Sequence, residues 1–416
     1  MTNMLRVDNF STDQHTAVEL MADPTIRIAA VTGEAGTGKT TVLGQCVQAV
    51  EDAGYTFKIC APTGRAAARI REATGRPANT AHRLLGYGAP DPNDPDDYSF
   101  PERGRGNPVP ADFIFVDESS MLSEELYRNL VDALSKNARI RFFGDINQLR
   151  PINVVGDSPF KRILEKFPKV ILTENYRSTD GIVQAAQTII KGRLPRANSQ
   201  FSILQIPNQM SLSVLDKFIS EDLLDPKKAQ IIAPTKVGKL GTNVINGYIQ
   251  QKLNSQETKV LELGYTMDND VRQETRIKPN DKILWTKNDY NLNLFNGMIG
   301  KVLDVDMVDG QIAAEFEGKD YLIPSLLEKF DDVGRCTVAY DPRKYIDLAY
   351  AITTHKSQGS EFDRVILMLY WSSVMSRQNF YTAVTRGKSH VMVLAGPGGM
   401  KAALKLETGF EEKRNK

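Results

Sequence analysis

Cysteine is scarce in this chain, with three residues in 416, and this scarcity excludes two classes of site. Cys46, Cys60 and Cys336 are odd in number, which does not suit a disulfide framework, and they lack the spacing of metal ligands. We therefore expect three reduced thiols in the interior of a cytoplasmic protein.

Long apolar runs are also absent. No segment approaches the roughly 20 apolar residues that cross a bilayer. The first residues, MTNMLRVDNFSTDQ, lack the basic, apolar and small-residue segments of a secretory signal. These absences predict a protein that has no membrane partner.

A large net charge is the third missing feature, because 52 Lys and Arg residues oppose 51 Asp and Glu residues, for a net charge of +1. A nucleic-acid partner would therefore have to meet basic groups that are concentrated in one groove. The apolar content of 41% and the charged content of 25% are typical of a globular protein. A chain of 416 residues is too long for one ordinary core, so we expect two to four domains.

Residues 33–40, GEAGTGKT, match the phosphate-loop pattern G-x-x-x-x-G-K-[ST] at every fixed position. The apolar run 26–32 before them suits a buried strand, and residues 41–51 after them can form a helix. The apolar positions of that helix, which we expect to face inward, are Val42, Cys46, Val47 and Val50. A glycine-rich turn that binds nothing is the alternative, but a strand and a helix in these places favour a nucleoside triphosphate.

Glycines in such a loop let backbone N–H groups converge on phosphate, and the helix N-terminus adds a favourable dipole. Lys39 would reach the β- and γ-phosphates, and the Thr40 hydroxyl would hold Mg²⁺. The residues predicted to contact the nucleotide are Gly33, Ala35, Gly36, Thr37, Gly38, Lys39, Thr40 and Thr41.

Two carboxylates and an amide follow further apolar runs. Asp117 and Glu118 come directly after residues 113–116 (FIFV), and Gln148 follows residues 140–143 (IRFF). Ligands bind at the carboxyl edge of parallel sheets, where these side chains would meet. We predict that Asp117 holds the metal, that Glu118 orients and deprotonates the attacking water, and that Gln148 contacts the γ-phosphate. Taken alone, the two acids would favour a helix N-cap followed by a solvated acid, and it is the preceding phosphate loop that favours the functional interpretation.

The segments GEAGTGKT, VDESSML and GDINQLRP, in this order, resemble the superfamily 1 helicases. Residues 61–67 (APTGRAA) and 80–86 (TAHRLLG) are similar to strand-contacting segments of the RecD-like branch. Residues 173–178 (TENYRS), 353–361 (TTHKSQGSE) and 381–387 (YTAVTRG) resemble three later motifs. The size and layout are most similar to the small Dda-like helicases of T-even phages, and the resemblance covers about residues 10–396.

This resemblance implies an α/β fold with two RecA-like parallel-sheet motor domains, 1A (1–86 and 111–175) and 2A (176–277 and 341–400). It adds a wedge-bearing insert, 1B (87–110), whose Pro, Gly and Asp content excludes a long helix or central strand. A mobile surface loop is the alternative for that insert. Phe100 is the candidate wedge residue, with Tyr98 second, because an aromatic ring can stack on the last base pair.

Residues 278–340 are expected to form a second insert, 2B. Short alternating runs separated by Asn-Gly, Asp-Gly and Glu-Gly turns over residues 281–323 predict a small Src-homology-3-like β-barrel. Residues 401–416 alternate in charge, and we expect them to form a flexible tail.

An arginine that reaches the γ-phosphate from a second domain makes hydrolysis depend on domain closure. Arg177 and Arg386 are the candidates that the resemblance supplies, and a surface salt bridge is the alternative for each. The resemblance also implies nucleotide contacts for Gly359 and Glu361. Gln14 has two interpretations, adenine contact and a capping box with Ser11, and both can hold together.

Strand contacts are implied by the resemblance at Thr63, Arg65, His82, Thr354, His355 and Lys356, besides the wedge Phe100. Hydroxyl, imidazole and cationic groups suit phosphate contact, which positions a strand without reading its sequence. His82 by itself could also be a satisfied structural histidine.

Together these features predict an ATP-dependent DNA helicase that moves along single-stranded DNA and unwinds duplex or forked DNA with ATP and Mg²⁺. The 5′-to-3′ direction follows from the resemblance alone. The alternative is an ATP-gated nucleic-acid-binding switch without processive unwinding, and RNA is disfavoured only by the resemblance. We expect a monomer in the cytoplasm (the host cytoplasm if a phage encodes it), and replication or recombination proteins stay open as partners.

Overall fold

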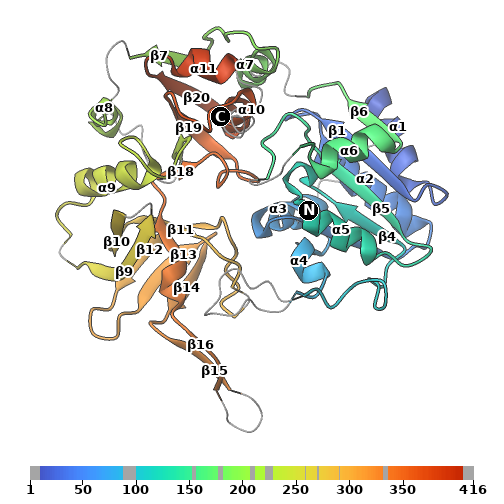
Figure 1. Cartoon of the computed structure of the whole chain (residues 1–416), viewed down its shortest axis with the longest axis horizontal. Coiled ribbons are helices and arrows are strands. Elements are labelled where there is room, and N and C mark those ends of the chain that lie inside the picture. Colours follow the sequence, from blue (N-terminus) through green and yellow to red (C-terminus); the bar gives the residue numbers. More distant parts are fainter. Residues whose placement is uncertain are drawn as a thin grey trace. The chain divides into compact units, whose positions relative to one another are not determined.

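The computed structural model of the chain describes residues 10–87, 100–151, 156–176, 181–206, 211–220, 228–257, 259–268, 271–289, 291–330 and 336–405. They divide into two compact units, the first ending at Gln184 and the second beginning at Ala185 (Figure 1). Among the described residues, no helix is long and apolar enough to cross a membrane.

A parallel sheet of six strands, in the order β3-β2-β4-β5-β1-β6, forms the centre of the first unit (Figure 1). Its strands are β1 (Ile28–Gly33), β2 (Phe57–Ala61), β3 (Ala78–Thr80), β4 (Phe113–Val116), β5 (Arg139–Gly144) and β6 (Lys169–Leu172). All strand pairs are parallel, so the carboxyl ends of β1, β4 and β5 meet at one edge. This confirms the predicted α/β class with a parallel sheet. The three strands predicted to end at the candidate site are β1, β4 and β5.

Helices cover both faces of this sheet, as a buried parallel sheet requires. One apolar cluster joins one face to α1 (Thr12–Ala22), α2 (Lys39–Asp52) and α3 (Gly64–Thr74). A second cluster joins the other face to α4 (Ala81–Leu84), α5 (Glu124–Asp132) and α6 (Pro159–Lys166).

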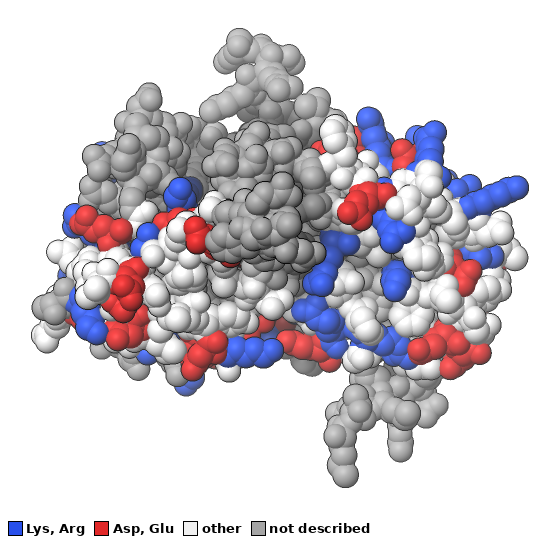
Figure 2. Space-filling model, turned by 90° about the horizontal axis from the view of Figure 1, so that it is seen from below, with Lys and Arg blue, Asp and Glu red and all other residues white. Residues whose placement is uncertain are grey.

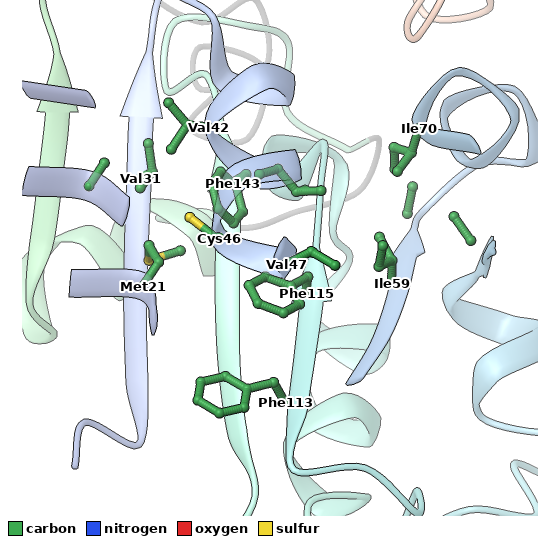
Figure 3. Packing of buried hydrophobic residues seen from close by; sticks show 14 of the residues in the cluster. Met21, Val31, Val42, Cys46, Val47, Ile59, Ile70, Phe113, Phe115 and Phe143 are labelled. Atoms are coloured by element: carbon green, nitrogen blue, oxygen red, sulfur yellow. The ribbon is translucent and has the colours of Figure 1, made fainter. Parts of the chain in front are cut away.

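Figure 3 shows the first cluster, in which Val42, Cys46 and Val47 of α2 lie among Phe115 and Phe143 of the sheet. The four α2 positions predicted to face inward are at most 1% exposed. Cys46 and Cys60 are buried free thiols, and burial raises the pKa of the Cys60 thiol to about 12. The Cys336 side chain lies outside the described residues.

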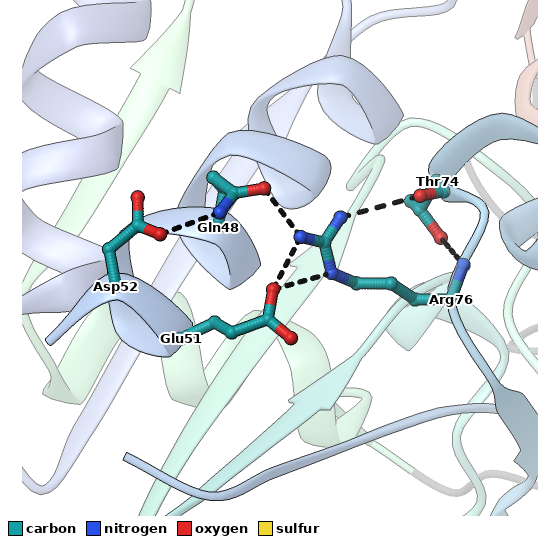
Figure 4. A network of polar contacts seen from close by, with 5 residues as sticks. All are labelled: Gln48, Glu51, Asp52, Thr74 and Arg76. Carbon is teal, nitrogen blue, oxygen red and sulfur yellow. Dashed lines mark hydrogen bonds and ion pairs between the residues drawn. The ribbon is translucent and has the colours of Figure 1, made fainter. Parts of the chain in front are cut away.

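Arg76 fixes the end of α2 that lies away from the phosphate loop (Figure 4). Its guanidinium donates to Gln48 Oε1 at 2.5 Å, to Glu51 Oε2 at 2.6 Å and to the Thr74 carbonyl at 3.4 Å. These bonds join the last turns of α2 to the end of α3 and so fix the C-terminal half of the helix that begins in the phosphate loop.

Arg141 is a fully buried cation on β5. It donates to the backbone carbonyls of Met21, Asp23, Ile26 and Arg27, which connect α1 to β1. Burial lowers the pKa of the guanidinium to about 10, so it stays charged at neutral pH. The side chain therefore supplies the donors that this buried connection needs.

Replacing Arg141 with methionine is expected to reduce the stability of this sheet by about 3–5 kcal/mol, because several buried carbonyls lose their donor. Hydrogen exchange of the β1 and β5 amides measures the change. Arg128→Met is the matched control, since Arg128 forms an exposed ion pair with Glu124 whose loss costs at most about 1 kcal/mol. Equal protection of these amides in the two variants would show that Arg141 is not needed for the stability of the sheet.

The second unit contains a parallel sheet in the order β18-β8-β19-β20-β7. Its strands are β7 (Phe201–Gln205), β8 (Ala229–Ala233), β18 (Ala351–Thr353), β19 (Phe362–Leu369) and β20 (Gly387–Ala395). The helices numbered from α7 onward are α7 (Gly181–Ile190), which crosses the division between the units, α8 (Val214–Ser220), α9 (Thr242–Leu253), α10 (Arg377–Val384) and α11 (Gly399–Lys405). Strand β8 is followed by helix α9, as β1 is followed by α2 in the first unit.

The predicted β-module is present as an antiparallel sheet in the order β14-β13-β12-β11-β17. Its strands are β11 (Lys282–Trp285), β12 (Ile299–Val305), β13 (Ile312–Phe316), β14 (Lys319–Ile323) and β17 (Ile346–Leu348). Two hairpins accompany it, β9 (Leu261–Asp268) with β10 (Val271–Ile277), and β15 (Leu327–Phe330) with β16 (Cys336–Tyr340).

The closed Src-homology-3-like barrel is not confirmed, because β14 and β17 are the two ends of the sheet order among the described residues. The fifth strand of the sheet, β17, also lies beyond residue 340, where the predicted insert ends. It has only three residues, which are too few to give an alternating pattern in the sequence. The tail expected from Lys401 is helical as far as Lys405, since Met400 and Ala403 are buried. Residues 100–110 contain neither a helix nor a sheet strand, as their composition predicts.

Candidate functional site

The phosphate loop adopts the geometry that its sequence predicts. Gly38 is the N-cap of α2 with a φ of 80°, and no side chain caps the helix, so its first N–H groups face the loop. Lys39 Nζ donates to the carbonyls of Gly33 and Glu34 at 2.8 and 2.9 Å. The ammonium therefore lies over the loop whose backbone would cradle phosphate.

Two glycines of the loop are required by close approach. A Cβ on Gly33 would lie 2.4 Å from Thr37 Oγ1, and one on Gly38 would lie 2.6 Å from Gln14 Nε2. Gly38 also has the positive φ that L side chains rarely adopt. The glycines at positions 33 and 38 are thus explained by close packing within the unit as well as by the need to approach phosphate.

The carboxylates lie directly after β4. Asp117 is 7% exposed, and burial together with the neighbouring Glu118 raises the pKa of its carboxyl to about 6. The Glu118 N–H donates to Asp117 Oδ1 at 2.8 Å, and Lys39 interacts favourably with the charged form. A desolvated acid that is held close to a cationic group is typical of functional sites.

Glu118 has a left-handed backbone, with a φ of 50°, which is uncommon for a residue other than glycine. Such strain persists only where the surrounding structure fixes it, and it is concentrated at active sites. Here it turns the chain between β4 and the short helix of residues 119–121.

Three buried oxygens at this edge have no hydrogen-bond partner among the described residues: Thr32 Oγ1, Glu118 Oε2 and Gln148 Oε1. The Gln148 side chain is 4% exposed. The backbone N–H of Gln148 donates to the backbone carbonyl of Asp145, and this bond holds the turn after β5. Buried polar atoms normally have partners, so oxygens that lack one at the end of three neighbouring strands indicate a site for a polar ligand.

This arrangement fits a nucleotide with a divalent metal. No group of three or more His, Cys, Asp or Glu residues in the described ranges could hold a metal by itself. Magnesium commonly takes one or two protein ligands and completes its shell with phosphate oxygens and water, so Thr40 and Asp117 suffice as protein ligands.

Gln14 forms the predicted capping box with Ser11, and it makes two further bonds. Its Nε2 donates to the Thr37 carbonyl at 3.2 Å, and its Oε1 accepts from the Tyr176 hydroxyl at 2.7 Å as well as from the Ser11 N–H. Both lone pairs of the amide oxygen are therefore used. The remaining N–H of the side-chain amide can donate to N7 of a base, an atom that adenine and guanine share. Adenine contact by Gln14 therefore stays a prediction, and this contact alone would not distinguish the two purines.

Asn175 and Tyr176 are residues that sequence reasoning missed. Asn175 Nδ2 donates to the Ala35 carbonyl at 2.8 Å, and the Tyr176 N–H donates to the Gly36 carbonyl at 3.2 Å. They precede Arg177 in the segment TENYRS, which drew attention only for its arginine. Arg177 itself lies outside the described residues.

Arg386 follows α10 in the second unit and is 3% exposed. Its guanidinium donates to the carbonyls of Thr382 and Ser360 and to Thr385 Oγ1. Gly359 and Glu361 flank Ser360, so the two candidate nucleotide-contacting residues of this unit are connected to Arg386 through the backbone. The finger role stays a prediction.

The assignment of Thr354 to strand contact is corrected by its environment. The residue is fully buried, and its hydroxyl donates to Asn379 Oδ1 at 2.9 Å. A side chain that is 0% exposed cannot meet a strand, so Thr354 instead joins the loop after β18 to α10. The sequence placed it in a loop motif but gave no information on which side of the loop it faces.

His355 and Lys356 of the same loop are half-buried, and burial lowers the pKa of the His355 imidazole. In the first unit, Thr63 is the N-cap of α3 and accepts from the Ala66 N–H, and Arg65 lies in the first turn of that helix. His82 packs edge-on against Tyr87, and burial lowers the pKa of its imidazole too.

Phe100 is 94% exposed, whereas Tyr98 lies outside the described residues. On the face shown in Figure 2, Lys and Arg side chains are interspersed with Asp and Glu side chains and gather only in short rows. This distribution agrees with the near-zero net charge.

Comparison with protein families matches an AAA domain to residues 9–204 and a UvrD-like helicase C-terminal domain to residues 348–394. Among curated relatives, the ATP-dependent RecD2 DNA helicase of Deinococcus radiodurans is 31% identical over 370 residues, which cover 87% of this chain and 46% of the relative. The RecBCD enzyme subunit RecD of Mycolicibacterium smegmatis is 28% identical, over 91% of this chain and 70% of the relative. The chain thus spans less than half the length of the Deinococcus relative.

Two solved structures share the fold. A Bacteroides Pif1 helicase in complex with ADP-AlF3 and ssDNA has a TM-score of 0.57 and 20% identity, covering 95% of this chain and 94% of that one. A structure of two coordinating Pif1 helicases at forked dsDNA has a TM-score of 0.58 and 21% identity, with coverage of 93% and 92%.

Proposed function

We propose that the chain is a RecD-like superfamily 1 helicase, which uses ATP to translocate on single-stranded DNA and to unwind duplex DNA; its matches to an AAA domain, a UvrD-like helicase C-terminal domain and the RecD2 helicase support this. The observation that carries this proposal is the edge where β1, β4 and β5 end. There the phosphate loop adjoins a desolvated Asp117, a strained Glu118 and unpartnered oxygens of Glu118 and Gln148.

In the proposed site, Lys39 neutralises charge on the β- and γ-phosphates, while Thr40 and Asp117 hold Mg²⁺. The metal, when bound, withdraws charge from the transferred phosphoryl group. Glu118 orients the attacking water and accepts its proton, and Gln148 contacts the γ-phosphate. Arg177 and Arg386 stabilise the transition state, with Gln14, Gly359 and Glu361 as further nucleotide contacts.

The proposed DNA contacts are Thr63, Arg65, His82, His355 and Lys356, with Phe100 as wedge. We propose motor domains 1A (1–86 and 111–175) and 2A (176–277 and 341–400), and inserts 1B (87–110) and 2B (278–340), with the second insert forming a small barrel. The proposal includes a monomeric cytoplasmic enzyme and 5′-to-3′ movement. It leaves replication or recombination proteins open as partners.

Duplexes with a single-stranded tail on one side test this function. With ATP and Mg²⁺, we expect unwinding of a duplex with a 5′ tail and little unwinding of one with a 3′ tail. Unwinding from the 3′ tail alone would contradict the direction. ATP hydrolysis without unwinding of either substrate would favour the ATP-gated switch instead.

A further inference from the structure

A cavity of about 220 Å³ lies within the second unit, where α9 and β18 approach the strands of the β-module. Its polar lining includes Lys236, Thr242, Asn243, Asp347 and Lys356. Since a water molecule takes about 30 Å³ in the liquid, this cavity has room for a phosphate group and several waters.

Three charged groups meet in the cavity. Lys356 Nζ lies 2.7 Å from Asp347 Oδ2, and Lys236 Nζ lies 4.0 Å from the same oxygen. The side chains of Lys236, Lys356 and Asp347 are 42%, 32% and 31% exposed, so all three stay accessible to a solute. An ammonium group has three donors, so each lysine can bind a second anion besides the carboxylate.

The start of α9 positions Lys236. The N–H groups of Thr242 and Asn243 donate to the carbonyls of Thr235 and Lys236 at 3.0 and 3.1 Å. These bonds hold the loop after β8 against the start of α9 and use the N–H groups there. The charge of the cavity therefore comes from its side chains: two ammonium groups around one carboxylate give it a net preference for negative charge.

We propose that this cavity binds one backbone phosphate of the DNA strand, with Lys236 as a strand contact that the helicase motifs do not assign. Asp347 competes with the phosphate for both ammonium groups, so it weakens the grip on the strand. This inference rests on the proposed function, because it takes single-stranded DNA as the partner.

The two charged positions are therefore expected to have opposite effects. Both effects are measured as the affinity of the full chain for an oligothymidylate. Fluorescence anisotropy gives this affinity over a range of salt concentrations. Lys236→Ala should weaken binding by roughly tenfold at low salt and reduce the slope of log affinity against log salt by about 0.7, as the loss of one phosphate contact predicts. Asp347→Asn should tighten binding.

Lys239→Ala is the matched control, because Lys239 is an exposed lysine of the same loop that does not line the cavity. It should change the affinity less than twofold, and Lys236→Gln should repeat the result of Lys236→Ala. Equal effects at Lys236 and Lys239, or weaker binding by Asp347→Asn, would overturn the proposal. If the unchanged chain does not bind the oligomer at all, both the proposed function and this phosphate site fail. If the unchanged chain binds and Lys236→Ala has no effect, the phosphate site fails and the proposed function stands.

Discussion

Replacing Glu118 with glutamine is expected to lower the rate of ATP hydrolysis by about 10²–10⁴-fold, which is the usual contribution of a general base. Glutamine has nearly the same shape but cannot accept the proton of the attacking water. ATP affinity should stay within a few-fold, because the phosphate loop and Asp117 are unchanged. Single-turnover hydrolysis and binding of a fluorescent ATP analogue separate the two effects.

Glu125→Gln is the matched control for this variant, because Glu125 is an exposed acid on α5 in the same unit. It should hydrolyse ATP at the unchanged rate. Since Glu118 has a left-handed backbone, a structural role must also be considered. Equal loss of hydrolysis and binding in Glu118→Gln would indicate such a role, and an unchanged rate would exclude Glu118 as the base.

Replacing Arg386 with lysine is expected to reduce ATP turnover by about 10³–10⁵-fold, the range of an arginine finger. Lysine keeps the charge but lacks the planar fork that contacts a phosphoryl group at two points. ATP affinity should change little, because the proposed finger acts in the transition state. Steady-state hydrolysis at saturating ATP gives the result.

The intramolecular bonds of Arg386 make a stability control necessary. Arg377 also donates to backbone carbonyls of this unit, those of Ile190 and Leu404. Arg377→Lys should therefore lower the melting temperature and leave turnover per folded molecule unchanged. If Arg386→Lys loses stability as Arg377→Lys does but keeps turnover within tenfold, Arg386 is a structural residue.

The centre of the first unit could be predicted from sequence because its signals are local. Strand β1, the loop and α2 follow one another within 25 residues, from Ile28 to Asp52, and the glycines and apolar spacing constrain each part. Glu118 and Gln148 follow runs that carry buried aromatic residues, FIFV and IRFF, so their common edge could be deduced from the expected parallel order.

Contacts between distant parts of the chain could not be predicted. The bond between Tyr176 and Gln14 joins residues that are 162 positions apart, and no local pattern indicates it. Thr354 has a loop sequence but a buried side chain, because α10 supplies Asn379 as its partner. The strand β17 has three residues and is defined only by its pairing with β11.

The measurement that tests the central claim most directly is steady-state ATP hydrolysis by the unchanged chain, with and without single-stranded DNA. The proposed motor predicts strong stimulation by DNA, which Glu118→Gln abolishes. Hydrolysis that is indifferent to DNA would contradict a DNA-dependent motor and leave an ATPase whose cycle is not coupled to DNA, as in the ATP-gated switch.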